Sequence, residues 1–203
     1  MEQLLAYLNQ FYPMTPACMH YLRRVIRPKH IAKGEYLLRP DMVSRHIYFI
    51  VRGLVRTFYV LDDGTEVSSW FLKEQDLVVS VLSFYDQVPS FEYIQTLEPT
   101  EAFYISYEEL NTAYHQYPEF NFIARVLELH YFKLLAWRLY AIQMQRADKR
   151  FEWLRDNHPE IIERVPQKYI SSYINQTPVT LSKMKSKVAG KKPSRANNPD
   201  RSS

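Results

Sequence analysis

The chain has 203 residues, of which 46% are hydrophobic and 15% aromatic, so it can build a substantial core and global disorder is not expected. No run of about 18 uncharged apolar residues occurs, which argues against a membrane span. The first residues, MEQLLAYLNQFY, lack the basic region and cleavage site of a signal peptide. A single cysteine, Cys18, supplies neither an internal disulfide nor the ligands of an iron–sulfur cluster. We therefore expect a cytoplasmic protein with no membrane partner.

The charge is distributed unevenly along the chain. Residues 1–145 contain 13 Lys/Arg and 16 Asp/Glu, a net charge of −3, whereas residues 146–203 contain 13 Lys/Arg and 6 Asp/Glu, a net charge of +7. A basic C-terminal quarter on a slightly acidic body suggests a polyanionic partner that binds this quarter alone. The alternative is a solvated basic tail.

Residues 1–27 carry apolar side chains at helical spacing on either side of the break YPMTP, which predicts two short helices. Thr15 before Pro16 is typical of an N-cap followed by a proline in the first turn of the second helix.

From about residue 28 the apolar period becomes two, and short β-branched and aromatic runs alternate with turns. Three of the four glycines stand in the turn pairs Lys33-Gly34, Arg52-Gly53 and Asp63-Gly64. Asp63-Gly64 lies between two strand-like runs and predicts a β-hairpin with a type I′ turn. Because the few glycines of the chain are concentrated in these turns, the pattern favours a compact antiparallel barrel or jelly roll.

Residues 118–146 predict one long helix with apolar residues on two sides. A heptad seam is formed by Ile123, Leu127, His130, Leu134, Trp137 and Ala141, and a second stripe by Phe122, Val126, Leu129 and Phe132. A helix that is apolar on two sides must be covered on two sides. We expect one side to pack on the barrel and the heptad seam to pack on a twin helix in a homodimer. The alternative is a helix buried within one monomer.

The segment PQKYISSYINQTPVTLSKMKSKV, residues 166–188, predicts a short helix, a tight turn and a second helix capped by Thr177, which together describe a helix-turn-helix. In such a motif the second helix enters the major groove of DNA. The expected contacts with bases and phosphates come from Thr177, Pro178, Val179, Thr180, Ser182, Lys183, Lys185 and Lys187. The alternative is a helical hairpin that packs on the body. Residues 191–203 show no periodicity and predict a disordered basic tail.

The order of these parts resembles the Crp/Fnr family of bacterial transcription regulators. KGEYLLRP, IYFIVRGLVRTFYVLDDGTEV and EAFYISYEEL look like its cyclic-nucleotide-binding domain, and YISSYINQTPVTLSKMKSKV looks like its DNA-reading motif, with Asn175 where glycine is common. The resemblance implies an α+β fold: a double-stranded β-helix (jelly-roll) barrel domain at 1–117, a dimerisation helix at 118–146 and a helical DNA-binding domain at 147–190. It also implies a homodimer on a two-fold symmetric double-stranded DNA site. Family members often add a β-hairpin wing, but RDNHPEIIERVPQK shows no strand-like alternation.

The segment QDLVVSVLSFYDQVPSFEYIQT stands where nucleotide-binding relatives carry a glycine–glutamate pair and an arginine, and it contains neither. A cyclic phosphate without a cationic partner would bear an uncompensated desolvation cost. We therefore expect no cyclic AMP binding of the usual kind. Two readings stay open: an apolar pocket for an unidentified small-molecule effector, or a filled site. The candidate pocket residues are Phe71, Val81, Phe84, Tyr85, Phe91 and Tyr93.

The sequence offers no signal for metal, cofactor or catalysis. The six histidines lack the spacing of a helical metal site, and no nucleophile with a base or phosphate-binding loop is visible, so we expect neither an enzyme nor a cofactor. Sensing roles for His130 and Cys18 stay open. A dimeric small-molecule-binding or protein-interaction module without DNA binding is the alternative function.

Overall fold

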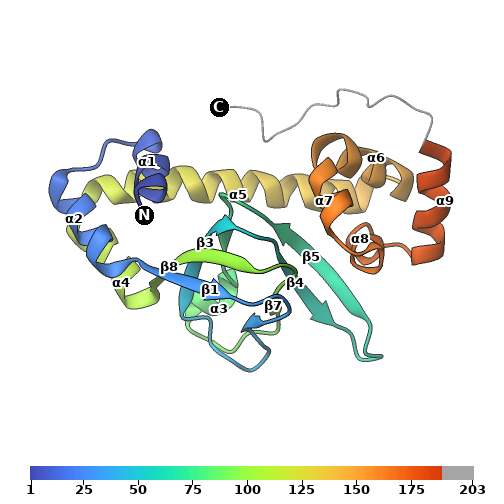
Figure 1. The fold of residues 1–203 in the computed structure, drawn as a ribbon, viewed down its shortest axis with the longest axis horizontal. Helices are drawn as coiled ribbons and strands as arrows, with labels where there is room; N and C mark the ends of the chain where they lie inside the picture. Colours follow the sequence, from blue (N-terminus) through green and yellow to red (C-terminus); the bar gives the residue numbers. More distant parts are fainter. Residues whose placement is uncertain (189–203) are drawn as a thin grey trace. The chain divides into compact units, whose positions relative to one another are not determined.

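The computed structural model describes residues 1–188, and its path is shown in Figure 1. The chain forms two compact units. The first consists of Met1–Phe58 with Phe71–Leu129, and the second of Tyr59–Trp70 with the chain from His130 onward. The polypeptide therefore passes between the units three times, and a short hairpin from the first half of the sequence belongs to the second unit. The predicted tail at 191–203 lies outside the described residues.

Two helices open the first unit as the sequence predicts, α1 (Glu2–Phe11) and α2 (Pro16–Val25). The Thr15 hydroxyl accepts a hydrogen bond from the Cys18 backbone N–H at 3.2 Å, so Thr15 caps α2 and Pro16 occupies its first turn.

Within residues 1–188, eight strands form two antiparallel sheets of four. One has the order β1 (Arg27–Ile31), β8 (Thr100–Ser106), β3 (His46–Arg52) and β6 (Leu77–Val78). The other has the order β2 (Tyr36–Leu38), β7 (Tyr93–Thr96), β4 (Val55–Val60) and β5 (Glu66–Leu72), and the helix α3 (Val81–Asp86) links β6 to β7. Antiparallel pairing and the mixed α and β content match the expectation. The sheets do not close into a barrel within the described residues.

The hairpin at Asp63-Gly64 is present, but the predicted turn type is wrong. A type I′ turn needs positive φ at both central residues, and here Gly64 has φ +84° while Asp63 does not have positive φ. The Gly64 N–H donates to the Leu61 carbonyl at 2.8 Å, and the Leu61 N–H donates to the Thr65 carbonyl at 2.9 Å. The loop is thus longer than two residues, and glycine closes its turn.

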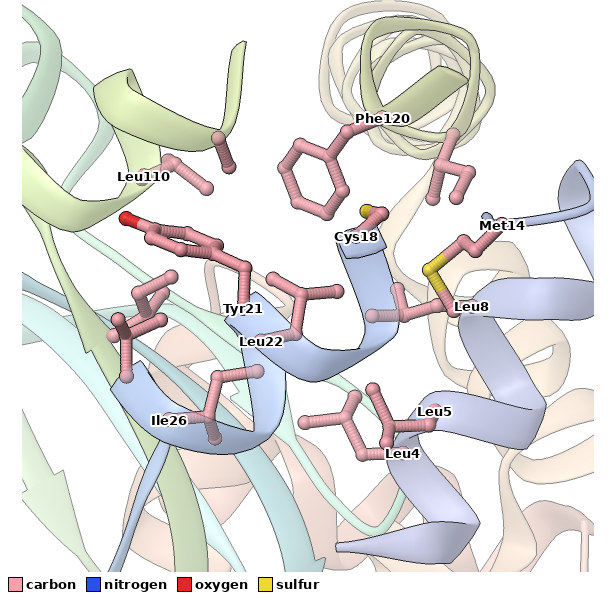
Figure 2. Close-up of a cluster of buried hydrophobic side chains, with 14 of the residues drawn as sticks. Leu4, Leu5, Leu8, Met14, Cys18, Tyr21, Leu22, Ile26, Leu110 and Phe120 are labelled. Carbon is pink, nitrogen blue, oxygen red and sulfur yellow. The ribbon is translucent and has the colours of Figure 1, made fainter. Parts of the chain in front are cut away.

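A hydrophobic core joins the terminal helices of the first unit, and Figure 2 shows side chains of α1, α2 and α4 (Tyr107–Gln116) converging with Phe120. Leu22 and Cys18 are fully buried at its centre. The Ser106 hydroxyl and the Glu109 carboxylate form a capping box at the start of α4. The alternation of β3 and β8 sends Phe49 and Ile105 into the same core.

The long helix α5 (Pro118–Met144) is present, but our assignment of its two faces requires a correction. Ile123 and Leu127 of the heptad seam are 0% and 8% exposed and belong to the core of the first unit, so they are not available to a twin helix. The second stripe is exposed instead: Phe122, Val126, Leu129 and Phe132. The correction concerns the start of the seam only, because His130 is exposed and Leu134, Trp137 and Ala141 are half-buried. Periodicity could not tell which part of each face the chain covers itself.

The second unit continues with α6 (Ala147–Asn157), α7 (Pro159–Arg164), α8 (Gln167–Tyr173) and α9 (Pro178–Val188). Helices α6 and α7 occupy the segment in which a wing hairpin would stand, as the absence of strand alternation predicts. Across the described part of the chain, no helix combines the length and apolar character needed to cross a membrane.

Candidate functional site

Buried serine hydroxyls bond one another and the backbone in the segment around α3, where the family resemblance leads us to expect a cyclic phosphate. The hydroxyls of Ser80, before α3, and Ser90, after it, lie 3.2 Å apart and are buried. The Ser83 hydroxyl donates to the Val88 carbonyl at 2.6 Å and accepts the Ser44 backbone N–H at 2.8 Å. These hydrogen bonds satisfy buried polar groups from within the chain, as a packed site requires.

The six candidate pocket residues differ widely in exposure. Phe84 is fully buried and packs edge-on against Tyr107 at a centroid distance of 5.4 Å, whereas Val81, Tyr85 and Phe91 are exposed. Tyr93 stacks on Phe58 at 4.7 Å, and Phe71 is half-buried. Phe84 is thus a core residue whereas Val81, Tyr85 and Phe91 lie at the surface, and the sequence periodicity did not predict this difference.

Sequence reasoning missed a buried arginine in the first unit. Arg56 in β4 is fully buried, its guanidinium lies 3.8 Å from the centroid of the Phe58 ring, and it donates to the Gln95 side-chain carbonyl at 3.1 Å. The guanidinium is therefore held inside the first unit, against Phe58 and Gln95.

In the second unit, α8 and α9 are joined by a tight turn at residues 174–177. Asn175 adopts the left-handed conformation with φ +56°, which explains why an asparagine stands where glycine is common. The Thr177 hydroxyl accepts the Thr180 backbone N–H at 3.2 Å and caps α9. Ile174 and Leu181 are buried on either side of the turn and fix the angle between the helices.

The opposite face of α9 is polar and basic. Thr177, Pro178, Val179, Ser182, Lys183 and Lys187 are exposed, and Thr180 and Lys185 are half-buried. The helix carries no acidic residue in its first turn and two lysines in its last. All eight predicted DNA-contacting residues thus lie at or near the surface on one capped helix, where a phosphate or base edge can reach them.

Two arginines that the sequence did not single out hold this region together. The guanidinium of Arg150 in α6 donates to the Ile174 carbonyl at 2.8 and 3.1 Å and also bonds the Gln145 carbonyl, so it fixes the turn before α9. Arg138 in α5 donates to the Tyr173 carbonyl at 3.2 Å and stacks on the Tyr173 ring at 3.7 Å.

The β4–β5 hairpin also contacts α8 within the second unit. The Ser68 backbone N–H donates to the Ser172 hydroxyl at 3.1 Å, and that hydroxyl donates to the Ser68 hydroxyl at 3.0 Å. Arg138 approaches the same strand, with its guanidinium 3.5 Å from the Ser68 carbonyl oxygen. A strand from the first half of the sequence is therefore fastened to the helix that precedes the turn.

His130 and Cys18, the two residues considered for a sensing role, lie in different surroundings. His130 is exposed on α5. Cys18 is buried, and this burial, with a smaller contribution from the Glu119 charge, raises the pKa of its thiol to about 11. Among the described residues no three His, Cys, Asp or Glu side chains are grouped so as to hold a metal ion.

Comparison with known proteins identifies the first part of the chain directly. Residues 28–117 match the family model described as the cyclic nucleotide-binding domain. No curated protein sequence matches the chain.

Solved structures resemble the whole fold at low sequence identity. They include the c-di-GMP-responsive global regulator CLP of Xanthomonas campestris, with TM-score 0.68 and 14% identity over 91% of this chain and 97% of that one. They also include FixK2 of Bradyrhizobium japonicum, with TM-score 0.66 and 18% identity over 87% and 95%. A protein of Eubacterium rectale assigned to the Crp/Fnr family of transcriptional regulators has TM-score 0.69 and 16% identity over 89% and 88%. Residues 28–117 are therefore a domain of the cyclic nucleotide-binding type, and the chain shares its fold with regulators of the Crp/Fnr family.

Proposed function

We propose that this protein is a homodimeric DNA-binding transcription regulator that does not use cyclic AMP in the usual way. The observation that carries the proposal is the pair α8–α9: a tight turn with left-handed Asn175, a capped second helix, and an exposed basic face on that helix. A helix of this kind presents its first turns to the major groove. The fold shared with regulators of the Crp/Fnr family supports the same reading.

The dimer forms through the exposed stripe of α5. Phe122, Val126, Leu129 and Phe132 are exposed at helical spacing, and exposed apolar residues continue with Leu135, Leu139, Tyr140 and Met144. An apolar surface of this length on one helix is costly in water and is stabilised by a partner. A second copy is the occupant that gives two recognition helices and a two-fold symmetric DNA site.

The phosphate cassette is filled. The Ser80–Ser90 hydrogen bond and the buried Phe84 occupy the segment, and the segment supplies Asp76, Asp86 and Glu92 but no lysine or arginine. The segment offers an anionic ligand no cation of its own, and such a ligand would have to displace satisfied polar groups. Regulation, where it occurs, acts as a population shift between dimer geometries and originates outside this cassette.

The test is the salt dependence of DNA binding by the purified full chain, measured with generic duplex DNA by fluorescence anisotropy. Each protein–phosphate contact contributes about −0.9 to the slope of log K against log salt. Replacing Lys183 and Lys185 with glutamate removes two contacts per protomer, so the slope of the dimer should become shallower by between about 3 and 4. The matched control replaces the exposed Lys33 and Arg52 of the first unit with glutamate, which changes the net charge equally.

Two results would contradict the proposal. If both double variants weaken binding equally, the attraction is a property of net charge and not of α9. If the wild-type protein does not bind DNA at low salt, the alternative of a small-molecule or protein-interaction module without DNA binding is favoured.

A further inference from the structure

A pocket of about 310 Å³ opens in the first unit at a place other than the filled cassette. Its wall comes from β2, the loop that follows it, the start of β3 and one residue of β7, and it includes Leu38, Met42, Val43 and Ile94. None of the six residues that the sequence suggested for an effector pocket belongs to this wall. The volume lies at the small end of the range for small-molecule sites.

The residues that line the pocket are of two kinds. Leu37 joins the aliphatic residues, whereas Ser44, Arg45, His46 and Tyr48 carry hydrogen-bond donors. No acidic residue lines the pocket. Aliphatic residues combined with such donors suit a ligand with an apolar body and an anionic or strongly accepting end.

Tyr48 is the most informative residue of this wall. It is only 7% exposed, yet its hydroxyl makes no hydrogen bond with any of the residues that the structure describes. Burial of the ring raises the pKa of this phenol to about 12, so it remains a donor at neutral pH. The hydroxyl oxygen is not one of the fully buried atoms that lack a partner, so it keeps some exposure and a ligand can reach it. A ligand oxygen in the pocket would accept a hydrogen bond from it.

One positive charge lies over the Tyr48 ring, because the Lys29 ammonium is 5.7 Å from the ring centroid. His46 packs edge-on against Tyr104 at 5.1 Å, and burial together with the Lys29 charge lowers the pKa of its imidazole, which favours the neutral ring. Arg27 is also near, 5.9 Å from the Tyr104 ring, but Glu109 neutralises it through two hydrogen bonds. Lys29 does not line the pocket itself, but it makes no ion pair within the part of the chain that the structure covers, so its charge is available to an anion bound at Tyr48.

We infer that this pocket binds a small organic carboxylate with an apolar body. The body lies against Leu38, Val43 and Ile94, and the carboxylate accepts a hydrogen bond from Tyr48 close to the Lys29 charge. Inorganic phosphate has no body for the aliphatic wall, and an alcohol of the same length has no charge for Lys29. Binding itself does not depend on DNA recognition; only a role as the regulatory effector rests on the proposed function.

Hydrogen bonds also connect the loop that lines the pocket with the rest of the domain, so a ligand bound in the pocket can affect more than the pocket itself. The Asp41 N–H donates to the Ser90 carbonyl, the Ser90 N–H donates to the Met42 carbonyl, and the Ser44 N–H donates to the Ser83 hydroxyl, with N···O distances of 2.9, 2.9 and 2.8 Å. A ligand that orders this loop would therefore act on α3 itself, through Ser83, and on the loop after α3, through Ser90.

The experiment is calorimetric titration of the full-length protein with octanoate as the probe. We expect a Kd on the order of 0.1 mM, which about ten non-hydrogen atoms can supply. Octanol and octylammonium should bind at least about tenfold more weakly, because they lack the anionic end. Cyclic AMP in the same titration tests the filled cassette separately. Binding of cyclic AMP alone would contradict both proposals, whereas failure of DNA binding with intact octanoate binding contradicts only the regulator.

Variants locate the site. Tyr48→Phe removes only the hydroxyl and should weaken octanoate about tenfold, the usual cost of a hydrogen bond to a charged group. Tyr7→Phe, a hydroxyl deletion in the half-buried Tyr7 of α1, is the matched control and should leave binding unchanged. Lys29→Met should weaken binding severalfold, with Lys33→Met as its control. Val43→Trp should abolish binding by filling the pocket.

Three outcomes would overturn the inference: no octanoate binding by the wild type, equal binding of octanol, or unchanged binding in both Tyr48→Phe and Val43→Trp. If Tyr48→Phe loses its native circular dichroism, the exposed Lys29 and its control decide the question, because neither contributes to the core.

Discussion

Replacing Phe132 with glutamate tests the exposed stripe of α5 as the dimer interface. Phe132 is 66% exposed in the single chain and lies in the stripe with Leu129 and Val126. A phenylalanine buries roughly 200 Å², so about 130 Å² of this ring remains for a partner to cover. At about 25 cal/mol per Å² this corresponds to roughly 3 kcal/mol for each ring, or roughly 6 kcal/mol for two symmetric copies.

That value is an upper bound, because a partner helix covers only part of each ring. Each 1.4 kcal/mol is a factor of about ten in the dissociation constant, so even half of the value weakens the dimer about a hundredfold. Glutamate adds the cost of bringing two like charges together across the two-fold axis. Sedimentation velocity over a dilution series should show a dimer for the wild type and a monomer for Phe132→Glu at the same micromolar concentration.

The matched control is Phe91→Glu, the same substitution at a phenylalanine that is 59% exposed in the loop before β7. It should remain dimeric. The reasoning is refuted if Phe132→Glu dimerises as tightly as the wild type, or if the two variants dissociate equally. A monomeric wild type would remove the homodimer from the proposed function.

Two further predictions concern stability. In Gly53→Ala the new Cβ would lie 2.8 Å from the Thr100 Cα and still closer to its hydroxyl, at φ +121°, so we expect a loss of about 3 kcal/mol or more in the free energy of unfolding. Gly34→Ala at φ +85° meets nothing within 4 Å and should cost only about 1–2 kcal/mol; equal losses in urea unfolding would contradict this contact argument. Because the pKa of the Cys18 thiol is about 11 in the folded chain and 9.0 in the reference state, unfolding releases a proton between these values, and the thiol's contribution to stability is lost as pH rises through this window. Wild type should therefore lose roughly 2–3 kcal/mol more than Cys18→Ala between pH 9 and 11, and parallel pH profiles would show that the thiol ionises normally in the fold.

Local signals predicted the parts of the fold that depend on neighbouring residues. Thr15 and Thr177 cap helices because hydroxyl groups accept N–H groups two or three residues later, and this preference is visible in the sequence. The turn before α9 was expected with Asn175 in the place of a glycine, and the structure gives this residue positive φ.

The features that were missed depend on contacts between distant segments. Periodicity showed two apolar stripes on α5, but only the packing of Ile123 against the terminal helices decides which stripe is covered. Nothing in the sequence distinguishes Arg138 and Arg150 from other charged residues on helices. Each donates to a backbone carbonyl that lies 35 or 24 residues further along the chain, respectively. The pocket at Tyr48 combines β2, β3 and β7, which no local pattern brings together.

The hairpin at Tyr59–Trp70 has a consequence for how the chain is made. Ser68 meets Ser172 across 104 residues, so the second unit cannot be completed until synthesis has passed α8. A nascent chain that ends near Leu129 contains every residue of the first unit but leaves this hairpin without the helices that it packs against. Contacts of such long range close slowly. During synthesis the residues of the first unit are therefore complete before the inserted hairpin has the helices it packs against, and no single cut in the gene can separate the two units cleanly.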